Sequence, residues 1–333
     1  MKEKRKIVKI VLSIIILLLI SITIATVGIG NYFVDYAISR TGNGGEREIK
    51  NEELKEQVNN NSEKENIIER KREEERKLAE DWIENTKSKK VEVIANDNIT
   101  LRGTEYFTTE KSNKWVIILH GYHSSPDSVI SIGRHFAEEN YNVLIPSMRA
   151  SNESEGKYIG MGWLDKEDLK CWIDLIINEN KDAKIVLHGS SMGGATVLMA
   201  SGENLPNNIK AIVEDSGYTS VWDIFDSEAK ARFNLPSFPI LNMFQIVANV
   251  RAKYDIKEAS ALEQVKKARI PILFIHGEND DFVPEYMCEE LYNATTTKKE
   301  KLIVKGAGHT EARYKEPENY YNKIFGFLNK ISI

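Results

Sequence analysis

The feature that most constrains the fold of this chain is a series of short apolar segments that recur from residue 88 onward. Six of them are continuous apolar runs rich in β-branched residues, and the first two alternate apolar with polar residues. Continuous apolar strands are typical of a parallel sheet buried on both faces, whereas alternating strands keep one exposed face. In chain order the segments are VEVIAN (91–96), ITLRGTEYF (99–107), WVIILH (115–120), NVLIP (142–146), KIVLH (184–188), KAIVED (210–215), PILFIH (271–276) and EKLIVK (300–305).

Helical patterns separate these segments, for example over residues 163–177, and residues 321–328 carry apolar side chains at i, i+3, i+4 and i+7. Strands that alternate with helices predict βαβ units, so we expect a mostly parallel central sheet with helices on both faces. The sequence therefore predicts one α/β domain over residues 88–333. Residues 217–269 are too long for a single crossover, and we expect them to form a small helical cap.

The amino terminus differs in composition from the rest of the chain. Residues 1–9 are rich in Lys and Arg, and residues 10–34 contain no charged side chain. About 20 apolar residues cross a bilayer as a helix, so residues 1–34 are predicted to be a cytoplasmic basic flank and a transmembrane anchor. The positive-inside rule then places the body of the chain on the extracytoplasmic side of the cell membrane. A cleaved signal peptide is the alternative, because Thr23 and Ala25 resemble a cleavage site.

Residues 35–87 have the composition of a charged linker and helical stalk. The sequence SRTGNGGE at 39–46 contains the glycines of a flexible linker. Residues 46–80 are more than half charged and mixed in sign, which is typical of a solvated helix. Apolar residues near the end of this helix share one face and are expected to pack on the domain: Leu78, Ala79, Trp82 and Ile83.

The overall composition argues against several other classes of protein. The net charge of −5 disfavours nucleic acid as a partner. The two cysteines, Cys171 and Cys288, form no metal-binding pair, so we expect two core thiols. No cluster of ligands has metal-binding spacing and no glycine-rich phosphate loop is present, so the sequence predicts neither a metal nor another cofactor.

Chemically reactive side chains gather where the predicted strands end. Ligands of open parallel sheets bind beyond the carboxyl ends of the strands, so these loops should share one edge. Together they supply serine, carboxylates and histidine. The loops are LHGYHSSP (119–126), LHGSSMGG (187–194), EDSGYTS (214–220), IHGENDDFVP (275–284) and KGAGHTEA (305–312).

The stretch Gly-Ser-Ser-Met-Gly at 189–193 has the pattern of a nucleophile elbow. In such a turn, Gly-x-Ser-x-Gly between a strand and a helix exposes the central serine, here Ser191. Ser190 is the adjacent competitor, but only Ser191 has glycine two residues away on both sides. The turn also puts the Met192 amide at a helix N-terminus, where it can bind a developing oxyanion.

A serine nucleophile needs a base, and the base needs an orienting group. Asp280 and His309 follow Ser191 in the order nucleophile, acid, base, and they are the predicted partners. Asp281 and Asp215 also lie at strand ends and are the alternative acids.

On these motifs the sequence resembles the α/β-hydrolase superfamily over about residues 90–330, and it is most similar to bacterial esterases and prolyl-oligopeptidase-like enzymes. The family pattern HG-x-x-D-x-x-V-P stands at 276–284, which assigns the acid to Asp280. The family pattern G-x-G-H stands at 306–309, which assigns the base to His309. The resemblance therefore implies the same Ser–Asp–His set that the strand ends suggest.

The resemblance also covers the first oxyanion loop. The family sequence HG-x stands at 120–122, so the Tyr122 amide is implied as the second oxyanion donor beside Met192. One loop departs from the pattern: related enzymes often carry RGHGxSEG after the fourth strand, and this chain has RASNESEG at 149–156. Its histidine and two of its glycines are missing, so the turn there must differ.

The other histidines are assigned non-catalytic positions. His120, His188 and His276 each precede a glycine at a strand end and are expected to be buried spacers. His123 is expected in a solvated loop, and His135 on the surface of a helix.

These residues together predict a serine hydrolase that cleaves carboxylic esters through an acyl-enzyme, with the lipid bilayer as the partner of residues 10–34. A serine peptidase acting on short peptides is the enzymatic alternative, and a non-catalytic surface protein on a hydrolase fold is the other. The predicted cap carries apolar side chains that suggest a pocket for an apolar acyl or leaving group, or that simply pack the cap: Phe225, Phe233, Leu235, Phe238, Leu241 and Phe244.

Overall fold

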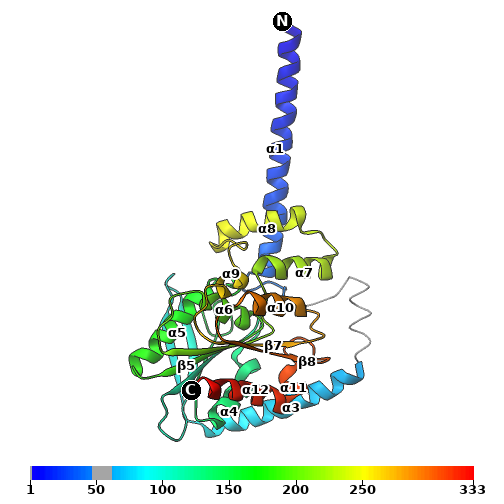
Figure 1. The fold of residues 1–333 in the computed structure, drawn as a ribbon. Coiled ribbons are helices and arrows are strands. Elements are labelled where there is room, and N and C mark those ends of the chain that lie inside the picture. Colours follow the sequence, from blue (N-terminus) through cyan, green and yellow to red (C-terminus); the bar gives the residue numbers. More distant parts are fainter. Residues whose placement is uncertain (1, 47–61) are drawn as a thin grey trace.

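The apolar segments form one eight-stranded sheet in the computed structural model, which describes residues 2–46 and 62–333 (Figure 1). Each strand coincides with one of the segments picked out by hydrophobic patterning. The strands are β1 (Ser88–Ile94), β2 (Thr100–Tyr106), β3 (Lys114–Leu119), β4 (Asn142–Pro146), β5 (Lys184–Ser190), β6 (Ile209–Asp215), β7 (Ile272–Gly277) and β8 (Lys299–Val304).

The strands follow the order β1-β2-β4-β3-β5-β6-β7-β8. Neighbours from β4 to β8 are parallel, whereas β1 and β2 are antiparallel to each other and β2 is antiparallel to β4. This confirms the predicted mostly parallel sheet. The register pairs Leu119 with Gly189 and Ser190 with Asp215, so the carboxyl ends of β3, β5 and β6 lie level. The loops that carry the predicted reactive residues therefore share one edge.

Helices cover both faces of the sheet, as predicted. Along β3, Trp115 and Ile117 join one hydrophobic core, while Val116 and Ile118 join a second core on the opposite face. The first core is covered by α5 (Asp165–Glu179), α6 (Met192–Ser201) and α10 (Glu285–Ala294), and the second by α3 (Ser62–Asn85), α4 (Ile130–Glu138), α12 (Pro317–Lys330) and the short elements η1 (Pro126–Val129) and α11 (Ala312–Lys315).

The predicted cap, residues 217–269, is helical in the structure. It contains α7 (Val221–Phe233), α8 (Ser237–Ala252) and α9 (Ala261–Val265). The helices α7 and α8 lie above the sheet at the end of the molecule from which the first helix extends (Figure 1). In contrast, α9 packs against α6. The cap over the carboxyl edge is therefore formed by α7 and α8.

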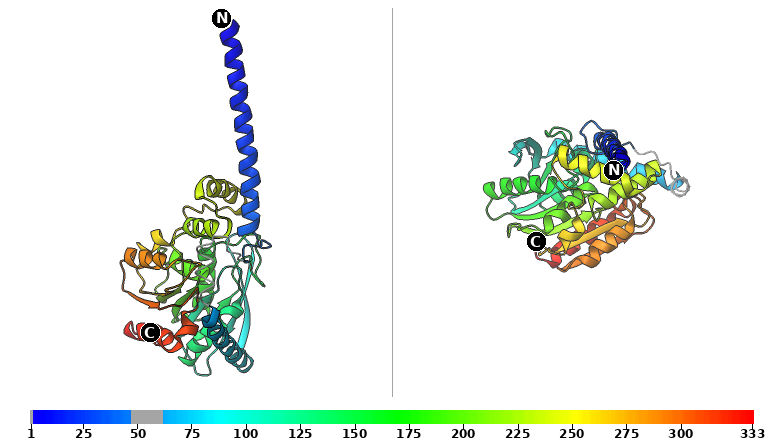
Figure 2. Two further views of the ribbon diagram at one scale, coloured as in Figure 1. Left: turned by 90° about the vertical axis from the view of Figure 1, so that its right-hand side faces the viewer. Right: turned by 90° about the horizontal axis from the view of Figure 1, so that it is seen from above.

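The first helix, α1 (Lys2–Ala37), extends from the domain as a long rod (Figure 2). Among the described residues it is the one helix long and apolar enough to cross a membrane. Its last turns pack on the domain, where Val34 is buried. At Gly30 the helix meets α8 so closely that a Cβ would overlap Val247 and the carbonyl of Met243. The absence of a side chain at Gly30 thus permits the contact between the two helices.

Arginine side chains fasten the end of α1 to the domain. Arg251 at the end of α8 donates to the side chains of Asn31 at 2.6 Å and Asp35 at 2.5 Å. Just after α1, Arg40 donates to the carbonyl of Ser154 at 2.6 Å. These contacts hold the helix in one position relative to the sheet.

The segment 39–46 does not act as the flexible linker expected from its glycines. Ser39 pairs with Tyr158 in an isolated β-bridge. A Cβ at Gly44 would overlap the hydroxyl of Tyr122, in the predicted oxyanion loop. The chain at Gly44 can therefore approach the domain this closely only because glycine has no side chain. From composition alone, a glycine needed for close packing looks the same as a glycine in a flexible linker.

The charged helix α3 also differs from the expected stalk. It lies along the second core, at the end of the domain opposite the free part of α1 (Figure 1). Ala79 is buried and Trp82 and Ile83 pack on this core, as expected. Leu78, in contrast, is 52% exposed, so it does not belong to the face that packs on the domain. The predicted stalk also includes residues 47–61, which lie outside the described residues.

Candidate active site

Ser191 occupies the turn between β5 and α6. Its backbone has φ 56° and ψ −118°, a conformation that side chains with a Cβ rarely adopt and that is typical of a nucleophile elbow. A Cβ at Gly189 would overlap the carbonyl of Gly193, so the turn closes only with glycine there. The Ser191 amide donates to the Asp215 carbonyl at 2.7 Å, which ties the turn to the neighbouring strand.

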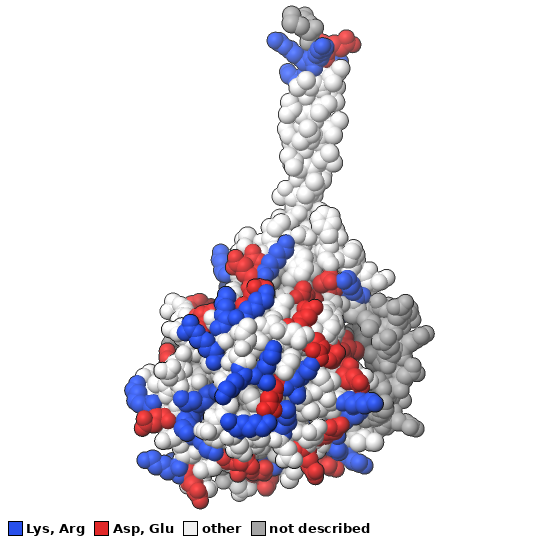
Figure 3. Space-filling model, in the orientation of Figure 1, with Lys and Arg blue, Asp and Glu red and all other residues white. Residues whose placement is uncertain are grey.

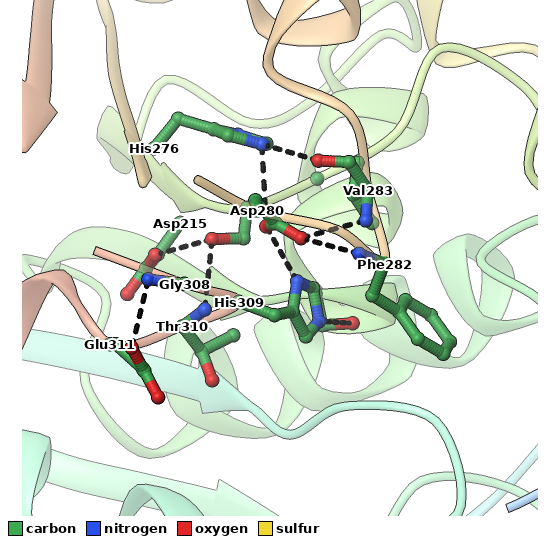
Figure 4. Close-up of polar contacts among 12 residues, drawn as sticks. Asp215, His276, Asp280, Phe282, Val283, Gly308, His309, Thr310 and Glu311 are labelled. Atoms are coloured by element: carbon green, nitrogen blue, oxygen red, sulfur yellow. Dashed lines mark hydrogen bonds and ion pairs between the residues drawn. The ribbon is translucent and has the colours of Figure 1, made fainter. Parts of the chain in front are cut away.

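The structure brings Ser191, His309 and Asp280 together in one hydrogen-bonded chain. His309 Nε2 lies 2.8 Å from Ser191 Oγ, and His309 Nδ1 lies 2.7 Å from Asp280 Oδ2 (Figure 4). Because a carboxylate only accepts, Nδ1 carries the proton and Nε2 accepts from the serine hydroxyl. This arrangement is the geometry required for a nucleophile, its base and an orienting acid.

The backbone after β7 holds the Asp280 carboxylate in place. Its Oδ1 accepts from the amides of Phe282 at 3.0 Å and Val283 at 2.8 Å. His276 Nε2, which is 2.8 Å from the Val283 carbonyl, lies 3.4 Å from Asp280 Oδ2 (Figure 4). The carboxylate is fully buried, so these contacts replace the water that it loses.

The pKa values of the two ionisable partners are shifted in opposite directions. Burial alone lowers the pKa of His309, but attraction to Asp280 and the hydrogen bond with it outweigh burial, so the pKa of His309 is raised. Burial alone raises the pKa of Asp280, but the same pair outweighs burial and the pKa of Asp280 is lowered. Asp280 is therefore ionised at neutral pH and stabilises a protonated His309.

The alternative residues have other surroundings. The Asp215 carboxylate accepts from the hydroxyls of Tyr320 at 3.0 Å and Ser216 at 3.1 Å. Asp281 adds negative charge near His309, but the Nδ1 hydrogen bond is made with Asp280. The hydroxyl of Ser190 is buried and has no hydrogen-bond partner in the part of the chain that the structure describes.

The predicted oxyanion donors lie on both sides of the nucleophile. Met192 is the first residue of α6, where backbone N–H groups have no partner within the helix. The loop after β3 passes on the other side: a Cβ on Gly121 would lie 3.7 Å from Ser191 Oγ. Tyr122 follows in this loop and its hydroxyl donates to the Ala37 carbonyl at 2.5 Å. The oxyanion roles of the Met192 and Tyr122 amides remain predictions.

An apolar pocket beneath the cap reaches Ser191. Of the six apolar cap residues that the sequence analysis named, four line it: Phe225, Phe233, Leu241 and Phe244. Leu235 is not part of the lining, and Phe238 is 75% exposed, so these two do not form the pocket. The end of α1 supplies a further wall, from Phe33, Tyr36 and Ala37.

Two charged side chains in the lining pair with each other. Arg232 Nε donates to Glu228 Oε2 at 2.6 Å, and Arg232 Nη1 donates to the Gly44 carbonyl at 2.7 Å and lies 3.1 Å from the Tyr36 hydroxyl. The guanidinium carbon also lies 5.9 Å from the ring centre of Phe282. The pair therefore leaves the pocket apolar and connects the cap to the end of α1.

Comparison with known proteins gives the same architecture. A family model described as alpha/beta hydrolase fold matches residues 114–242, and a serine hydrolase (FSH1) model matches residues 188–311. The solved esterase Pf2001 of Pyrococcus furiosus is 25% identical with a TM-score of 0.59, and the match covers 74% of this chain and 93% of the esterase. The chain has the α/β-hydrolase fold.

A second solved α/β hydrolase shares the fold at lower identity. The acylaminoacyl peptidase of Pyrococcus horikoshii is 17% identical with a TM-score of 0.54, over 73% of this chain and 41% of the peptidase. Solved structures of an esterase and of a peptidase thus both share the fold of this chain, and the fold does not distinguish between those two activities.

Curated relatives match about two thirds of the hydrolase chain. The Bacillus subtilis protein YqkD is 28% identical over 65% of this chain and 72% of its own length. The Schizosaccharomyces pombe protein bem46 is 23% identical over 66% and 69%. A Saccharomyces cerevisiae relative described as a membrane protein, YNL320W, is 21% identical over 64% and 70%.

Part of the pocket of this hydrolase was missed by reasoning from the sequence. Phe33 and Tyr36 were included with the anchor and its linker, and Arg232 and Phe282 received no role. A signal for Tyr36 was present: tyrosine is enriched at the ends of membrane-spanning helices, and Tyr36 follows the apolar span. Phe282 lies inside the acid motif, and its ring centre is 5.0 Å from that of His309.

The loop that departs from the family pattern, residues 149–156, is held by other means. Arg149 makes two hydrogen bonds with Asp168, at 2.6 and 2.7 Å, and contacts Asp97 at 3.0 Å. Ala150 adopts a positive φ of 55° at the position where the family pattern RGHGxSEG has glycine. The buried ion pair between Arg149 and Asp168 therefore holds this turn in a loop that lacks two of the glycines of the family pattern.

The positions of most other histidines and cysteines agree with expectation. His120, His188 and His276 are fully buried, and Cys288 is buried, but Cys171 is partly exposed. The surface position expected for His135 is wrong. Its ring stacks on Tyr321 with centroids 3.6 Å apart, and its Nε2 lies 3.2 Å from Glu75 Oε2 on α3, because this helix covers the face that would otherwise be exposed.

Proposed function

We propose that this protein hydrolyses carboxylic esters through an acyl-enzyme formed on Ser191. The observation that carries the proposal is the continuous hydrogen-bonded chain from Ser191 through His309 to Asp280, with contacts of 2.8 and 2.7 Å. Its location in an elbow beside an apolar cavity supports the same function.

The first half of the reaction forms the acyl-enzyme. Ser191 Oγ attacks the ester carbonyl carbon while His309 Nε2 takes the hydroxyl proton. The tetrahedral intermediate then collapses, the bond to the leaving alkoxide breaks, and protonated His309 returns the proton to that oxygen. Asp280 keeps the imidazole in the required tautomer and stabilises its positive charge.

The second half repeats these steps with water. His309 removes a proton from a water molecule, the hydroxide attacks the acyl carbonyl, and the bond to Ser191 Oγ breaks. The proton on His309 returns to Ser191, and the carboxylic acid leaves. Backbone amides of Met192 and Tyr122 are the proposed donors to the oxyanion in both halves, and one such donor is typically worth about 2.7–4 kcal/mol.

The lining of the cavity favours an ester with an apolar acyl group. A peptidase that selects a charged peptide terminus needs an opposite charge directed at it, but the lining pair Glu228–Arg232 is joined at 2.6 Å. An apolar acyl chain needs only the hydrophobic surface that the cap and α1 provide. Short peptides remain the alternative substrate class.

Labelling and kinetics together test the proposal. A fluorophosphonate probe should label the wild-type protein but not Ser191→Ala, and labelling of neither would support a non-catalytic surface protein instead. The wild type should then cleave short to medium acyl esters with a higher kcat/KM than aminoacyl amides. A higher value for the amides would assign the protein to the peptidases.

We further propose that α1 anchors the domain on the extracytoplasmic side of the cell membrane. The cationic flank before the apolar span supports this orientation. Protease added to intact cells should remove an epitope tag placed after Ile333. Protection of the tag until the cells are permeabilised would place the domain in the cytoplasm, and a mature N-terminus near Thr26 would show that the anchor is cleaved.

A further inference from the structure

The length of the exposed part of α1 sets the distance between the membrane and the pocket. Residues 10–28 are uncharged and largely exposed, and they span about 28 Å at 1.5 Å per residue. The hydrocarbon core of a bilayer is about 30 Å thick. Contact with the domain begins at the next turn, around Gly30. The domain therefore starts where the hydrocarbon core ends.

The pocket begins almost at this boundary. Phe33, the first α1 residue in its lining, is about 6 Å along the helix beyond Ile29. The polar layer of a bilayer is roughly 5–8 Å thick on each side, and it contains the ester groups of membrane lipids. Because Arg251 fastens α1 to α8, the pocket is held at the depth of those esters.

The helix α8 has an uncharged outer face, with Ile246, Asn249 and Val250 exposed, that the domain does not cover. Residues 235–250 contain no charged side chain. Leu241 and Phe244 point inward and line the pocket, whereas Ile246 is 56% and Val250 66% exposed. On the helix these exposed residues lie opposite the buried ones. Packing of the domain accounts for the apolar residues on the inner face of α8, but not for Ile246 and Val250 on its outer face.

The position of α8 indicates what covers its outer face. The helix crosses α1 at Gly30, the level at which the hydrocarbon core ends. In Figure 3 the uncharged surface of α1 meets an uncharged patch at the top right of the domain, whereas Lys, Arg, Asp and Glu side chains begin directly below the base of the helix on the left. A helix that lies flat at this depth with an apolar face is typical of one seated in the membrane interface.

We propose that the outer face of α8 sits in the bilayer surface, and that the substrate is a long-chain acyl ester held in that bilayer. The acyl chain passes from the membrane into the cavity between α1, α7 and α8, which brings its carbonyl to Ser191. The choice of substrate rests on the hydrolase function proposed above, whereas the seating of α8 does not.

Two esters with one leaving group test the substrate class. Full-length protein is reconstituted in phosphatidylcholine vesicles and assayed with methylumbelliferyl butyrate, which is water-soluble, and methylumbelliferyl oleate, which stays in the bilayer. The variant Ile246→Asp/Val250→Asp changes neither the lining nor the Ser–His–Asp chain. We expect its kcat/KM for the oleate to fall about tenfold or more, and that for the butyrate to stay within about twofold.

Leu78→Asp is the matched control, because Leu78 is an equally exposed apolar residue on α3, far from α1. It should leave both activities unchanged. Equal oleate turnover by all three proteins overturns the delivery of the substrate from the bilayer across the α8 face, and so does an equal loss on both esters in the α8 variant. If the wild type cleaves neither ester, the hydrolase function itself fails.

A second measurement tests the seating of α8 without any activity. Val250→Cys and, as control, Leu78→Cys are labelled with an environment-sensitive dye in a Cys171→Ser background that also carries Ser191→Ala. Lipids with a spin label near the headgroup should quench the dye at 250 strongly and the dye at 78 little. Equal, weak quenching at both positions overturns the seating of α8 in the bilayer surface. This is the result expected if a second protein molecule, rather than lipid, covered α8.

Discussion

The catalytic edge of the sheet and the pocket above it are constructed in different ways. Ser191, Asp280 and His309 each lie in a short loop directly after a strand, so the parallel sheet brings them together. The pocket instead joins side chains from distant parts of the chain: the rings of Phe33 and Phe233 meet edge to face with centroids 5.5 Å apart. Local motifs specify the edge, whereas long-range packing specifies the pocket.

This difference separates two properties of the protein. The chemistry depends on backbone turns that glycine and strand ends define locally. In the function that we propose, selection of the substrate depends on how α1 packs against α7 and α8, and α1 is also the candidate membrane anchor. The proposed membrane anchor and the proposed substrate pocket therefore share the end of α1. The two regions should respond differently to substitution.

The largest effect is expected at the nucleophile and base. Ser191→Ala and His309→Ala should each reduce kcat by about 10⁶, because the reaction uses the two groups as a unit. Ester turnover measures this, with circular dichroism to check folding. Ser190→Ala is the matched control, and its hydroxyl does not contact His309. If Ser190→Ala abolished activity and Ser191→Ala did not, our assignment of Ser191 as the nucleophile would be wrong.

The acid should contribute less than the base. Asp280→Asn is expected to lower kcat by about 10⁴, since the carboxylate orients and stabilises the imidazolium but transfers no proton. Asp281→Asn should retain most activity. Asp215→Asn should chiefly reduce stability, because its buried carboxylate accepts from Tyr320 and Ser216. Near-native turnover by Asp280→Asn, with a loss of several decades in either other variant, would show that our choice of acid is wrong.

Substitution in the α1 wall should change binding rather than chemistry. Phe33→Ala removes a ring from the lining, so KM for a medium-chain ester should rise about tenfold, equal to about 1.4 kcal/mol, with kcat nearly unchanged. Steady-state kinetics of the full-length protein in vesicles measure the split. Val27→Ala is the control, because Val27 lies on the same helix, is exposed and does not line the pocket. Equal effects of the two variants would remove α1 from the substrate site.

The smallest effect concerns the pH profile. His309 must be neutral to accept the serine proton, and Asp280 raises its pKa, so kcat/KM should increase as pH rises through that raised value. In Asp280→Asn the carboxylate charge is lost, so the residual activity should rise at a lower pH. A profile with the same midpoint in both proteins would mean that Asp280 does not act on His309.

The sequence alone determined the sheet and the elbow, because both rest on local rules. Period and length of the apolar runs specify the strands, and overlap with the Gly193 carbonyl makes any residue larger than glycine unacceptable at Gly189. The order of Ser191, Asp280 and His309 followed from motifs at strand ends. These features involve neighbours in the chain or the constant geometry of a parallel sheet.

Only the tertiary structure decided what the amino-terminal segments do. The glycine at 44 looks like part of a linker until Tyr122 is placed against it. Leu78 was expected to pack on the domain but is exposed, and His135 was expected on the surface but is covered by α3, which lies along the second core. Phe33 becomes part of a substrate pocket only when α8 meets α1 at Gly30. The physical reason is that close packing depends on the shape of surfaces from remote segments, which hydrophobic patterning along one segment does not record.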